Sequence, residues 1–333
     1  MKIIIPMAGW GSRLRPHTIK IPKPMVKIAG KPIVQRLVEN LSESVSGKIE
    51  EINFIIRKEF GAETEAKLKE VAKEMGTKAI ISYQESPEGT AHAIYCAKES
   101  LKGNVIVAFA DTLFKTDFKI DTSKDGVIWV NKIDDPSAFG VVKLDKDNVI
   151  TDFVEKPKDF VSDLAIIGIY YFKSGEDLQT EIEYLLDNDI REKGEYQLTN
   201  ALENLKQKGA KFVPGEVTEW LDCGNKNACV FTNQRVLEIN KDSEKLTFSK
   251  NFNNSVIIEP CFIGKNVEIH NSIIGPHVSI GTGTVIENSR IENTIIQEGS
   301  EIYGRIIKNS MLGKFVKLKN AAEDLSIGDY TEI

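Results

Sequence analysis

The sequence predicts an α/β fold with a mixed, mainly parallel sheet, followed by a short all-β part. In the first part, short aliphatic runs alternate with longer amphipathic stretches, which is the pattern of strands connected by helices. In the second part, aliphatic residues recur every five or six positions. The chain has 333 residues, which is enough for two domains. We therefore expect one domain over residues 1–240, a polar linker at 241–254 and a second domain over 255–333.

The elements of the first part follow from local periodicity. Aliphatic runs predict buried strands at 2–5, 52–56, 79–82 and 105–109. The 3.6-residue period predicts helices between them at 32–45, 62–75 and 90–100. Beyond Asp111 the pattern predicts strands at 126–131, 139–144, 149–154 and 165–172, and helices near 175–186, 197–208 and 225–240.

The second part carries a repeat. Its regularly spaced aliphatic residues are Ile263, Ile269, Ile274, Ile280, Ile286, Ile291, Ile296, Ile302, Ile307, Leu312 and Leu318. A helix cannot keep such a spacing on one face, but a coil with three flat sides can point one aliphatic residue inward from each side. Asn followed by Ser or Thr recurs beside these positions. We therefore predict a left-handed parallel β-helix of about four coils, against the alternative of an ordinary β-rich domain with chance spacing.

Charge and composition exclude several classes of protein. The 43 Lys and Arg residues against 49 Asp and Glu give a net charge of −6, so a basic nucleic-acid-binding face is not expected. The sequence contains no apolar run near the roughly 20 residues of a membrane span, and its first apolar stretch is too short for a signal peptide. We expect a cytoplasmic protein without membrane or nucleic-acid partners. The four Cys residues have no CxxC spacing, which argues against disulfides and structural zinc.

A glycine-containing loop directly after the first strand is a candidate phosphate site. Residues 9–16, here named the phosphate loop, read Gly-Trp-Gly-Ser-Arg-Leu-Arg-Pro. Glycine allows backbone N–H groups to approach a phosphate closely. The loop lacks the third Gly of the dinucleotide fingerprint and the Gly-Lys-Ser/Thr of a P-loop. Arg13 and, ten residues later, Lys23 could bring two cations to one polyphosphate.

Two further segments carry candidate ligand-binding groups. Asp111 follows an apolar strand, and ligands of open α/β sheets bind outside the carboxyl ends of strands. A single Asp at such a position can also be a turn former. In residues 84–93, the Gln84 amide suits the edge of a pyrimidine, Gly89 would let a base lie against the backbone, and Thr90 would cap the next helix. A helix-capping loop without a ligand is the alternative for this segment.

The spacing of residues 9–24 resembles that of the sugar-1-phosphate nucleotidylyltransferases. The matching residues are Gly9, Gly11, Ser12, Arg13, Pro16, Thr18, Lys23 and Pro24. Among that family, glucose-1-phosphate thymidylyltransferases and their uridylyl relatives are the most similar. Further segments that resemble the family begin at Gln84, Val105, Asp135, Phe153, Gly194 and Trp220, so the resemblance covers nearly the whole chain. It implies a Rossmann-like nucleotide-diphospho-sugar transferase domain.

The resemblance also implies roles for individual residues. The family's nucleotide-binding positions correspond to Ala8, Gly9, Gly11, Ser12, Arg13, Gln84, Gly89, Thr90 and Asp111. Its sugar-phosphate positions correspond to Gly140, Glu155, Lys156 and Ile166, and its magnesium ligands to Asp111 and Asp222. Arg13, Lys23 and Lys156 would be catalytic. The chain departs from the family at Ala110, where Gly is usual, at Asn225, where Thr is frequent, and at Trp10, whose ring would either cover the nucleotide or lie on the loop surface.

The activity that the resemblance implies is nucleotidyl transfer. The expected enzyme joins dTTP or UTP to a sugar 1-phosphate, with glucose 1-phosphate as the first candidate, and releases pyrophosphate in the presence of Mg²⁺. A regulatory homologue without turnover is one alternative. A bifunctional enzyme similar to the acetylglucosamine-1-phosphate uridylyltransferases is another, with an acyltransferase β-helix in which His270 or His277 acts as a base. We also expect a homo-oligomer assembled in part through the β-helix.

Overall fold

The computed structural model describes residues 1–117, 119–249 and 251–320. The chain divides into two compact units. One comprises residues 1–26 and 31–228, and the other comprises residues 27–30 together with the chain from 229 onward. The division thus falls before the predicted domain boundary at 240. Within the described residues, no helix is both long and apolar enough to span a bilayer.

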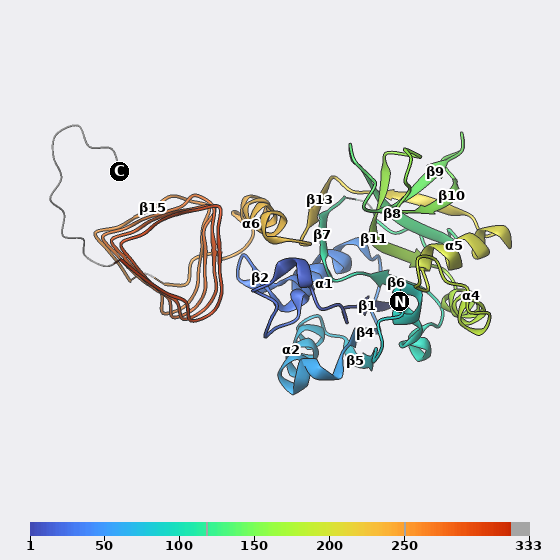
Figure 1. The fold of residues 1–333 in the computed structure, drawn as a ribbon, viewed down its shortest axis with the longest axis horizontal. Coiled ribbons are helices and arrows are strands. Elements are labelled where there is room, and N and C mark those ends of the chain that lie inside the picture. The colour runs from blue at the N-terminus through green and yellow to red at the C-terminus, as the bar shows by residue number, and fades with distance from the viewer. Residues whose placement is uncertain (118, 250, 321–333) are drawn as a thin grey trace. The chain divides into compact units, whose positions relative to one another are not determined.

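The first unit is built around a mixed sheet. The strands along its main path follow the order β10-β9-β11-β6-β1-β4-β5, and β8 extends it by pairing with β11 and β12 (Figure 1). The parallel part consists of β1 (Lys2–Pro6), β4 (Glu51–Ile56), β5 (Lys78–Tyr83) and β6 (Val105–Ala108). All four strands lie within two residues of their predicted ranges. The carboxyl ends of β1 and β6 therefore lie side by side, which places the phosphate loop next to Asp111.

Helices of the first unit cover the sheet with their apolar faces. They are α1 (Ile33–Ser44), α2 (Gly61–Glu74), α3 (Thr90–Tyr95), α4 (Gly175–Asp187) and α5 (Leu198–Gln207), with short 3-10 turns at Ser12–Leu14, Lys23–Met25, Lys58–Phe60 and Lys98–Ser100. On α1, Ile33, Leu37 and Leu41 are fully buried at helical spacing. The helix predicted over 90–100 is shorter than expected, because a 3-10 turn replaces its last part.

The remaining strands of the first unit are mostly antiparallel. Besides the two-residue β3 (Lys31–Pro32), they are β7 (Thr112–Lys115), β8 (Gly126–Lys132), β9 (Gly140–Leu144), β10 (Ile150–Glu155), β11 (Leu164–Phe172), β12 (Phe212–Glu216) and β13 (Glu219–Asp222). The pattern of the sequence predicted β8 to β11 but not β7, β12 or β13. None of these three strands contains a run of three aliphatic residues, and β12 includes Pro214 and Gly215, which are uncommon inside strands.

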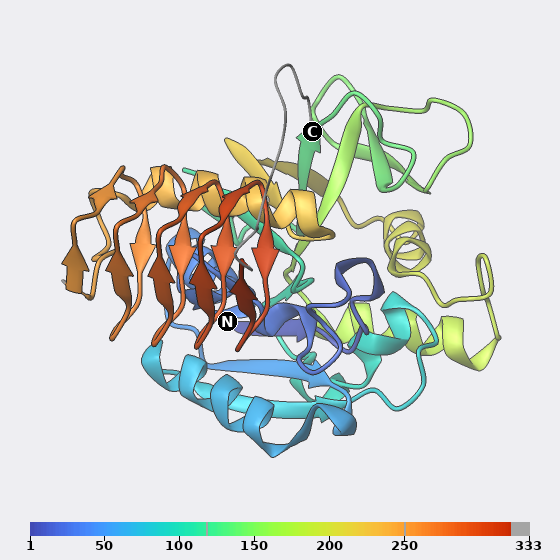
Figure 2. The same cartoon turned by 60° about the vertical axis from the view of Figure 1, so that its left-hand side comes forward.

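The second unit contains α6 (Lys226–Asn240, of which residues from 229 belong to it) and the β-helix. Three parallel sheets run along the β-helix, in the orders β14-β17-β20-β23-β26, β15-β18-β21-β24 and β16-β19-β22-β25. Their strands are β14 (Asn251–Asn253), β15 (Val256–Ile257), β16 (Phe262–Ile263), β17 (Glu268–His270), β18 (Ile273–Ile274), β19 (Ser279–Ile280), β20 (Val285–Glu287), β21 (Arg290–Glu292), β22 (Ile295–Ile296), β23 (Glu301–Tyr303), β24 (Ile306–Lys308), β25 (Met311–Leu312) and β26 (Lys317–Lys319). Seen end on, the coils form the triangle in Figure 1, and Figure 2 shows them stacked.

The predicted β-helix is confirmed by what its aliphatic residues do. All eleven residues of the repeat belong to one apolar core, and the eight from Ile263 to Ile302 are buried. β14 lies inside the range predicted as a linker and pairs with β17. The last residues of the predicted β-helix, 321–333, lie outside the described residues.

The Asn-Ser pairs explain how the coils turn and stack. Asn254, Asn271 and Asn288 each adopt a positive φ between 48 and 50°. Asparagine tolerates this left-handed conformation better than most residues. The Ser after each corner bonds to the next coil: the Ser255 hydroxyl oxygen accepts from the Ser272 N–H at 3.1 Å. The repeat therefore encodes both the corner and a ladder of hydrogen bonds.

Phe315 is an unusual residue for the corner of the β-helix that it occupies, because the backbone there has a positive φ. The equivalent positions of earlier coils hold Asn266, Gly283 and Gly299, and all four have positive φ. A bulky side chain in this conformation is strained by about 1–2 kcal/mol, and Phe315 is 72% exposed, so its ring is buried too little to offset the strain. We expect Phe315→Asn to stabilise the β-helix by about 1 kcal/mol, measured by chemical denaturation. Asn266→Phe is the converse variant, and equal stability of both variants and the wild type would contradict the argument.

Candidate active site

The phosphate loop is held in a conformation that requires glycine. Gly11 has φ +62°, and a Cβ there would lie 2.8 Å from the Cβ of Lys23. The Thr18 hydroxyl donates to the Gly11 carbonyl oxygen at 2.8 Å. The loop therefore folds back against the Lys23 segment, which brings the two predicted cations of the site together.

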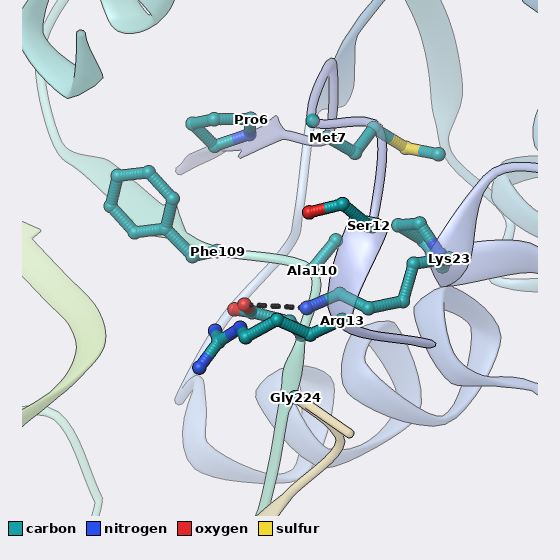
Figure 3. A pocket seen from close by; sticks show the side chains of 12 residues that line it. Pro6, Met7, Ser12, Arg13, Lys23, Phe109, Ala110 and Gly224 are labelled. Carbon is teal, nitrogen blue, oxygen red and sulfur yellow. Dashed lines mark hydrogen bonds and ion pairs between the residues drawn. The ribbon is translucent and has the colours of Figure 1, made fainter. Parts of the chain in front are cut away.

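A first pocket of about 280 Å³ opens at this loop. It is lined by Pro6, Met7, Gly9, Gly11, Ser12, Arg13, Lys23, Pro24, Phe109, Ala110, Asp111 and Gly224. Figure 3 shows the side chains of Arg13 and Lys23 extending alongside each other. The Lys23 ammonium lies 2.8 Å from Oδ2 of Asp111 (dashed line in Figure 3). A pocket with two cations beside backbone N–H groups suits a polyphosphate.

A second pocket of about 310 Å³ adjoins the first, because Arg13, Phe109 and Asp111 line both. It is also lined by Thr90, Thr112, Ala138, Phe139, Gly140, Glu155, Lys156, Ile166, Ile167, Gly168, Tyr170, Glu195, Gln197, Leu198, Thr199, Trp220 and Asp222. This pocket thus gathers the residues that the sequence assigned to the sugar phosphate and to the metal. Two adjoining pockets with a common charged wall can hold two substrates next to each other.

Asp111 and Asp222 meet because two short strands pair. β7 and β13 run antiparallel, and Asp222 stands opposite Thr112. The Cys223 N–H donates to the Asp111 carbonyl oxygen at 2.9 Å. The two carboxylates, far apart in the sequence, therefore line one pocket. This pairing was the part of the site that the sequence could not predict.

The Asp222 carboxyl responds to its burial and to the charged groups around it. Burial raises the pKa of the Asp222 carboxyl, and the negative charge of Asp111 raises it further, while Lys23 and Arg13 oppose the rise. Paired carboxylate oxygens are hard ligands of the kind that Mg²⁺ prefers. Among the described residues no group of three or more acidic, His or Cys side chains could hold a metal ion. The pair alone fits a magnesium ion that takes its other ligands from phosphate and water, as this ion commonly does.

Glu155 and Lys156 lie together at the wall of the second pocket. The Lys156 ammonium is 3.3 Å from a Glu155 carboxylate oxygen, and Glu155 is the more buried of the two. Gly140 faces Glu155 so closely that a Cβ would lie 3.2 Å from Oε2. Lys156 has φ +44°, a strained conformation that such sites retain when the surroundings fix it. The glycine leaves the carboxylate open to a ligand hydroxyl.

Three of the predicted nucleotide-binding residues do not line either pocket, and a fourth, Thr90, does not make its predicted contact. Gln84 does not line either pocket: its amide nitrogen lies 3.1 Å from Nδ1 of His92. Ala8 and Gly89 are also absent from the two linings, although each precedes a lining residue. The prediction that Thr90 caps its own helix is wrong, because its hydroxyl accepts from the N–H of Leu198, the first residue of α5, at 2.9 Å. Thr90 thus joins two helices at the second pocket.

Aromatic residues complete the second pocket, and the motifs did not identify them as a group. Phe139 and Trp220 meet edge to face with ring centroids 4.9 Å apart. Phe109 and Tyr170 meet in the same way at 6.2 Å. Burial raises the pKa of the Tyr170 hydroxyl, and Glu155 adds to the rise. Each ring is next to a motif residue in sequence or across a strand, but only the fold shows that the rings face one cavity.

The Trp10 ring is half exposed at the surface of the phosphate loop. Its ring stacks on the guanidinium of Arg57, whose carbon lies 4.8 Å from the ring centroid. Arg57 follows β4 and was not predicted to belong to the site.

Comparisons with known proteins agree with the predicted fold. A crystal structure of a candidate glucose-1-phosphate thymidylyltransferase from Bacillus anthracis superposes with a TM-score of 0.60 and covers 75% of this chain and 97% of that one. Its sequence is 22% identical, so the likeness supports the shared fold alone. This fold, with the parallel strand stacks described above, confirms the predicted α/β domain and β-helix.

Sequence comparison extends over the whole chain. A glucose-1-phosphate thymidylyltransferase of Streptomyces antibioticus is 30% identical over 100% of this chain and 99% of its own length. The bifunctional protein GlmU of Methanococcus vannielii is 30% identical over 94% of this chain and 75% of its own. A low-salt glycan biosynthesis nucleotidyltransferase of Haloferax volcanii is 28% identical over 98% and 96%. The family model for nucleotidyl transferases matches residues 2–239, and the chain therefore belongs to the nucleotidyl transferase family.

Proposed function

We propose that this nucleotidyl transferase joins a pyrimidine nucleoside triphosphate, dTTP or UTP, to a sugar 1-phosphate and releases pyrophosphate. One observation carries the proposal: Arg13, Phe109 and Asp111 line both pockets. The triphosphate would lie in the pocket of the phosphate loop and the sugar phosphate in the pocket of Glu155 and Lys156. The reacting groups would then meet at the common wall.

The reaction forms one bond and breaks one. An oxygen of the sugar phosphate attacks the α-phosphorus, the bond from that phosphorus to the bridging oxygen breaks, and pyrophosphate leaves with the electron pair. A sugar phosphate is already ionised near neutral pH, so no general base is needed. Arg13 and Lys23 would bind the β- and γ-phosphates and Lys156 would orient the attacking phosphate, since such transfers depend on position and charge neutralisation.

Asp111 and Asp222 would hold Mg²⁺. When bound, the ion would neutralise phosphate charge between the two pockets. Asp111 also pairs with Lys23, so this carboxylate would orient the ammonium toward the triphosphate. Glu155 would accept hydrogen bonds from sugar hydroxyls, because it lines the second pocket beside Gly140.

The identities of the base and of the sugar are proposed from the Gln84 side chain and from the similarity to a relative. The Gln84 amide would pair with a pyrimidine, for which its contact to His92 must open or be shared. One methyl group distinguishes thymine from uracil and is worth only about 1–3 kcal/mol in an apolar pocket, so both triphosphates are candidates. Glucose 1-phosphate is the first candidate sugar, in line with the name of the Streptomyces relative.

The proposal is tested by measuring pyrophosphate release from the purified protein with Mg²⁺. The assay crosses dTTP, UTP, GTP, CTP and ATP with glucose, glucosamine, acetylglucosamine and mannose 1-phosphates. We expect release with a pyrimidine triphosphate and one sugar phosphate. No release across the whole grid, from a protein that still binds a nucleotide, would favour the regulatory homologue instead.

Similarity to a bifunctional GlmU protein supports a second candidate function, acyl transfer by the β-helix. Of the two candidate bases, His277 lies 2.6 Å from Glu238, and His270 lies 3.8 Å from Glu268. Acetyl transfer from acetyl-coenzyme A to glucosamine 1-phosphate is the test. Loss of this transfer in His270→Ala or His277→Ala would support the second function, and no transfer by the wild type would exclude it.

We propose that the β-helix also assembles the enzyme into a homo-oligomer. The sheet β15-β18-β21-β24 aligns Val256, Ile273, Arg290 and Ile306 along one column. The three aliphatic residues of this column are exposed, and Ile306 reaches 86%. An exposed aliphatic column on a flat face is typical of a surface that associates.

The association has a direct test. We expect light scattering to give a mass that is a multiple of 37.2 kDa for the wild type, and a lower mass for Ile273→Glu combined with Ile306→Glu, because buried charges would oppose association. Glu268→Gln, a change on a different sheet of the β-helix, is the control. An unchanged mass in the double variant would show that this face is not the interface.

A further inference from the structure

Arg57 occupies an unusual position for a cation of the first unit. It follows β4 directly and is only 6% exposed. Burying a guanidinium is costly unless its charge and its N–H groups find partners. Among residues 1–117, 119–249 and 251–320, no acidic side chain forms an ion pair with it. The other contacts of the Arg57 side chain must therefore compensate for the cost of burying its charge.

Both observed contacts of the Arg57 side chain go to the two residues that flank Gly9, the first residue of the phosphate loop. Its Nε–H donates to the Ala8 carbonyl oxygen at 2.7 Å. Its guanidinium lies 4.8 Å from the centroid of the Trp10 ring. Phe60 meets the same ring edge to face at 6.3 Å. The Arg57 side chain thus contacts the residue before Gly9 and the residue after it.

Gly9 needs such support. A Cβ at Gly9 would meet no atom within 4 Å, so its surroundings do not restrain this glycine by packing. A glycine without close neighbours has the greatest conformational freedom to lose when a ligand binds. A charge-assisted hydrogen bond on one side and a cation–π contact on the other reduce that freedom before binding.

We propose that Arg57 and Trp10 act together as positioning residues that preorganise the phosphate loop for the nucleoside triphosphate. This inference rests on the proposed function, because it concerns the same site. Arg57 acts through Ala8 and Trp10 and is not assigned a contact with the reacting atoms. The effect should fall mainly on the nucleotide, since Ala8 and Trp10 flank Gly9, which lines the first pocket and not the second.

The test compares Michaelis constants for the two substrates. We expect Arg57→Met to raise the KM for dTTP or UTP about tenfold, the effect of losing a hydrogen bond to a charged group. The KM for the sugar 1-phosphate should stay within about twofold, because the second pocket is unchanged. Arg57→Lys should also raise the nucleotide KM, since an ammonium cannot both stack and donate in the same plane.

Trp10→Ala provides a second variant that does not depend on a buried position. Trp10 is half exposed, so this variant should fold, and it should raise the nucleotide KM in the same direction. If Arg57 and Trp10 act on the loop through the same contact, the double variant should have the same nucleotide KM as Arg57→Met alone. Lys58→Gln is the matched control: Lys58 is the neighbouring cation, pairs with Glu85 at the surface, and should leave both KM values unchanged.

Three results would overturn the inference. One is a lower melting temperature with an unchanged nucleotide KM, which is the signature of a purely structural arginine. Another is an equal rise of the KM values for both substrates, which would show that the variant disturbs both pockets and not the phosphate loop alone. The third is fully additive losses in the double variant. If the wild type itself neither binds dTTP or UTP nor releases pyrophosphate, the proposed function fails, and the inference falls with it.

Discussion

Replacing Asp111 with Asn should lower kcat by about 100- to 1000-fold, which corresponds to roughly 3–4 kcal/mol of transition-state stabilisation. The carboxylate has two tasks in the proposed reaction. It would be one of two magnesium ligands, and it holds the Lys23 ammonium at 2.8 Å. The Asn amide is neutral, so it provides no negatively charged ligand for the metal and no ion pair with Lys23.

The same change should affect nucleotide binding little. Lys23 loses its acidic partner and becomes free to bind phosphate more strongly, which offsets a weaker metal site. The measurement is pyrophosphate release at saturating substrates, together with the dissociation constant of the nucleotide. Asp187→Asn, an exposed Asp at the end of α4, is the control and should leave kcat unchanged. Wild-type turnover in a folded Asp111→Asn variant would refute the role of this carboxylate.

Replacing Gly89 with Ala should cost several kcal/mol of stability or displace the segment before α3, because two effects add. Gly89 has φ +115°, a conformation that other residues rarely adopt. A Cβ there would also lie 2.4 Å from the Tyr196 carbonyl oxygen and 2.7 Å from its nitrogen. Backbone atoms cannot move aside as a flexible side chain can. Since Thr90 bonds the start of α5, the displacement would reach the second pocket.

Gly76→Ala separates the two effects of this substitution. Gly76 also has a positive φ of 67°, but a Cβ there would meet nothing within 4 Å. We expect this control to cost only the backbone strain of about 1–2 kcal/mol. Chemical denaturation of both variants gives the difference, and the KM values of Gly89→Ala show whether the site moves. Equal stabilities of the two variants would mean that the contact with Tyr196 relaxes without cost.

The sequence predicted those features whose cause is local. The β-helix could be predicted from its aliphatic residues because every coil turns the same position inward. Ile269 and Ile286, for example, are paired on neighbouring coils. Asp111 could be predicted as a ligand-binding residue because it directly follows an apolar strand, and ligands of such sheets bind beyond the carboxyl ends of the strands. Arg13 and Lys23 were recognised from their spacing within one short segment.

Features that depend on distant contacts could not be predicted. The pairing of β7 with β13 joins segments about 110 residues apart, through strands of four residues each. The bond from Thr90 to α5 has a similar separation. Arg57 gave no signal, because a single Arg after a strand is usually a surface residue, and only the fold shows it buried against Trp10.

Labelled substrates test most directly whether the sugar phosphate attacks the α-phosphorus of the nucleoside triphosphate. The protein is incubated with glucose 1-phosphate, Mg²⁺ and dTTP or UTP labelled at the α-phosphate, and the products are separated. We expect the label to move into a sugar nucleotide, unlabelled pyrophosphate to form in equal amount, and a metal chelator to stop both. Label that stays in the triphosphate, or that appears in a nucleoside monophosphate without sugar, would contradict attack of the sugar phosphate on the α-phosphorus.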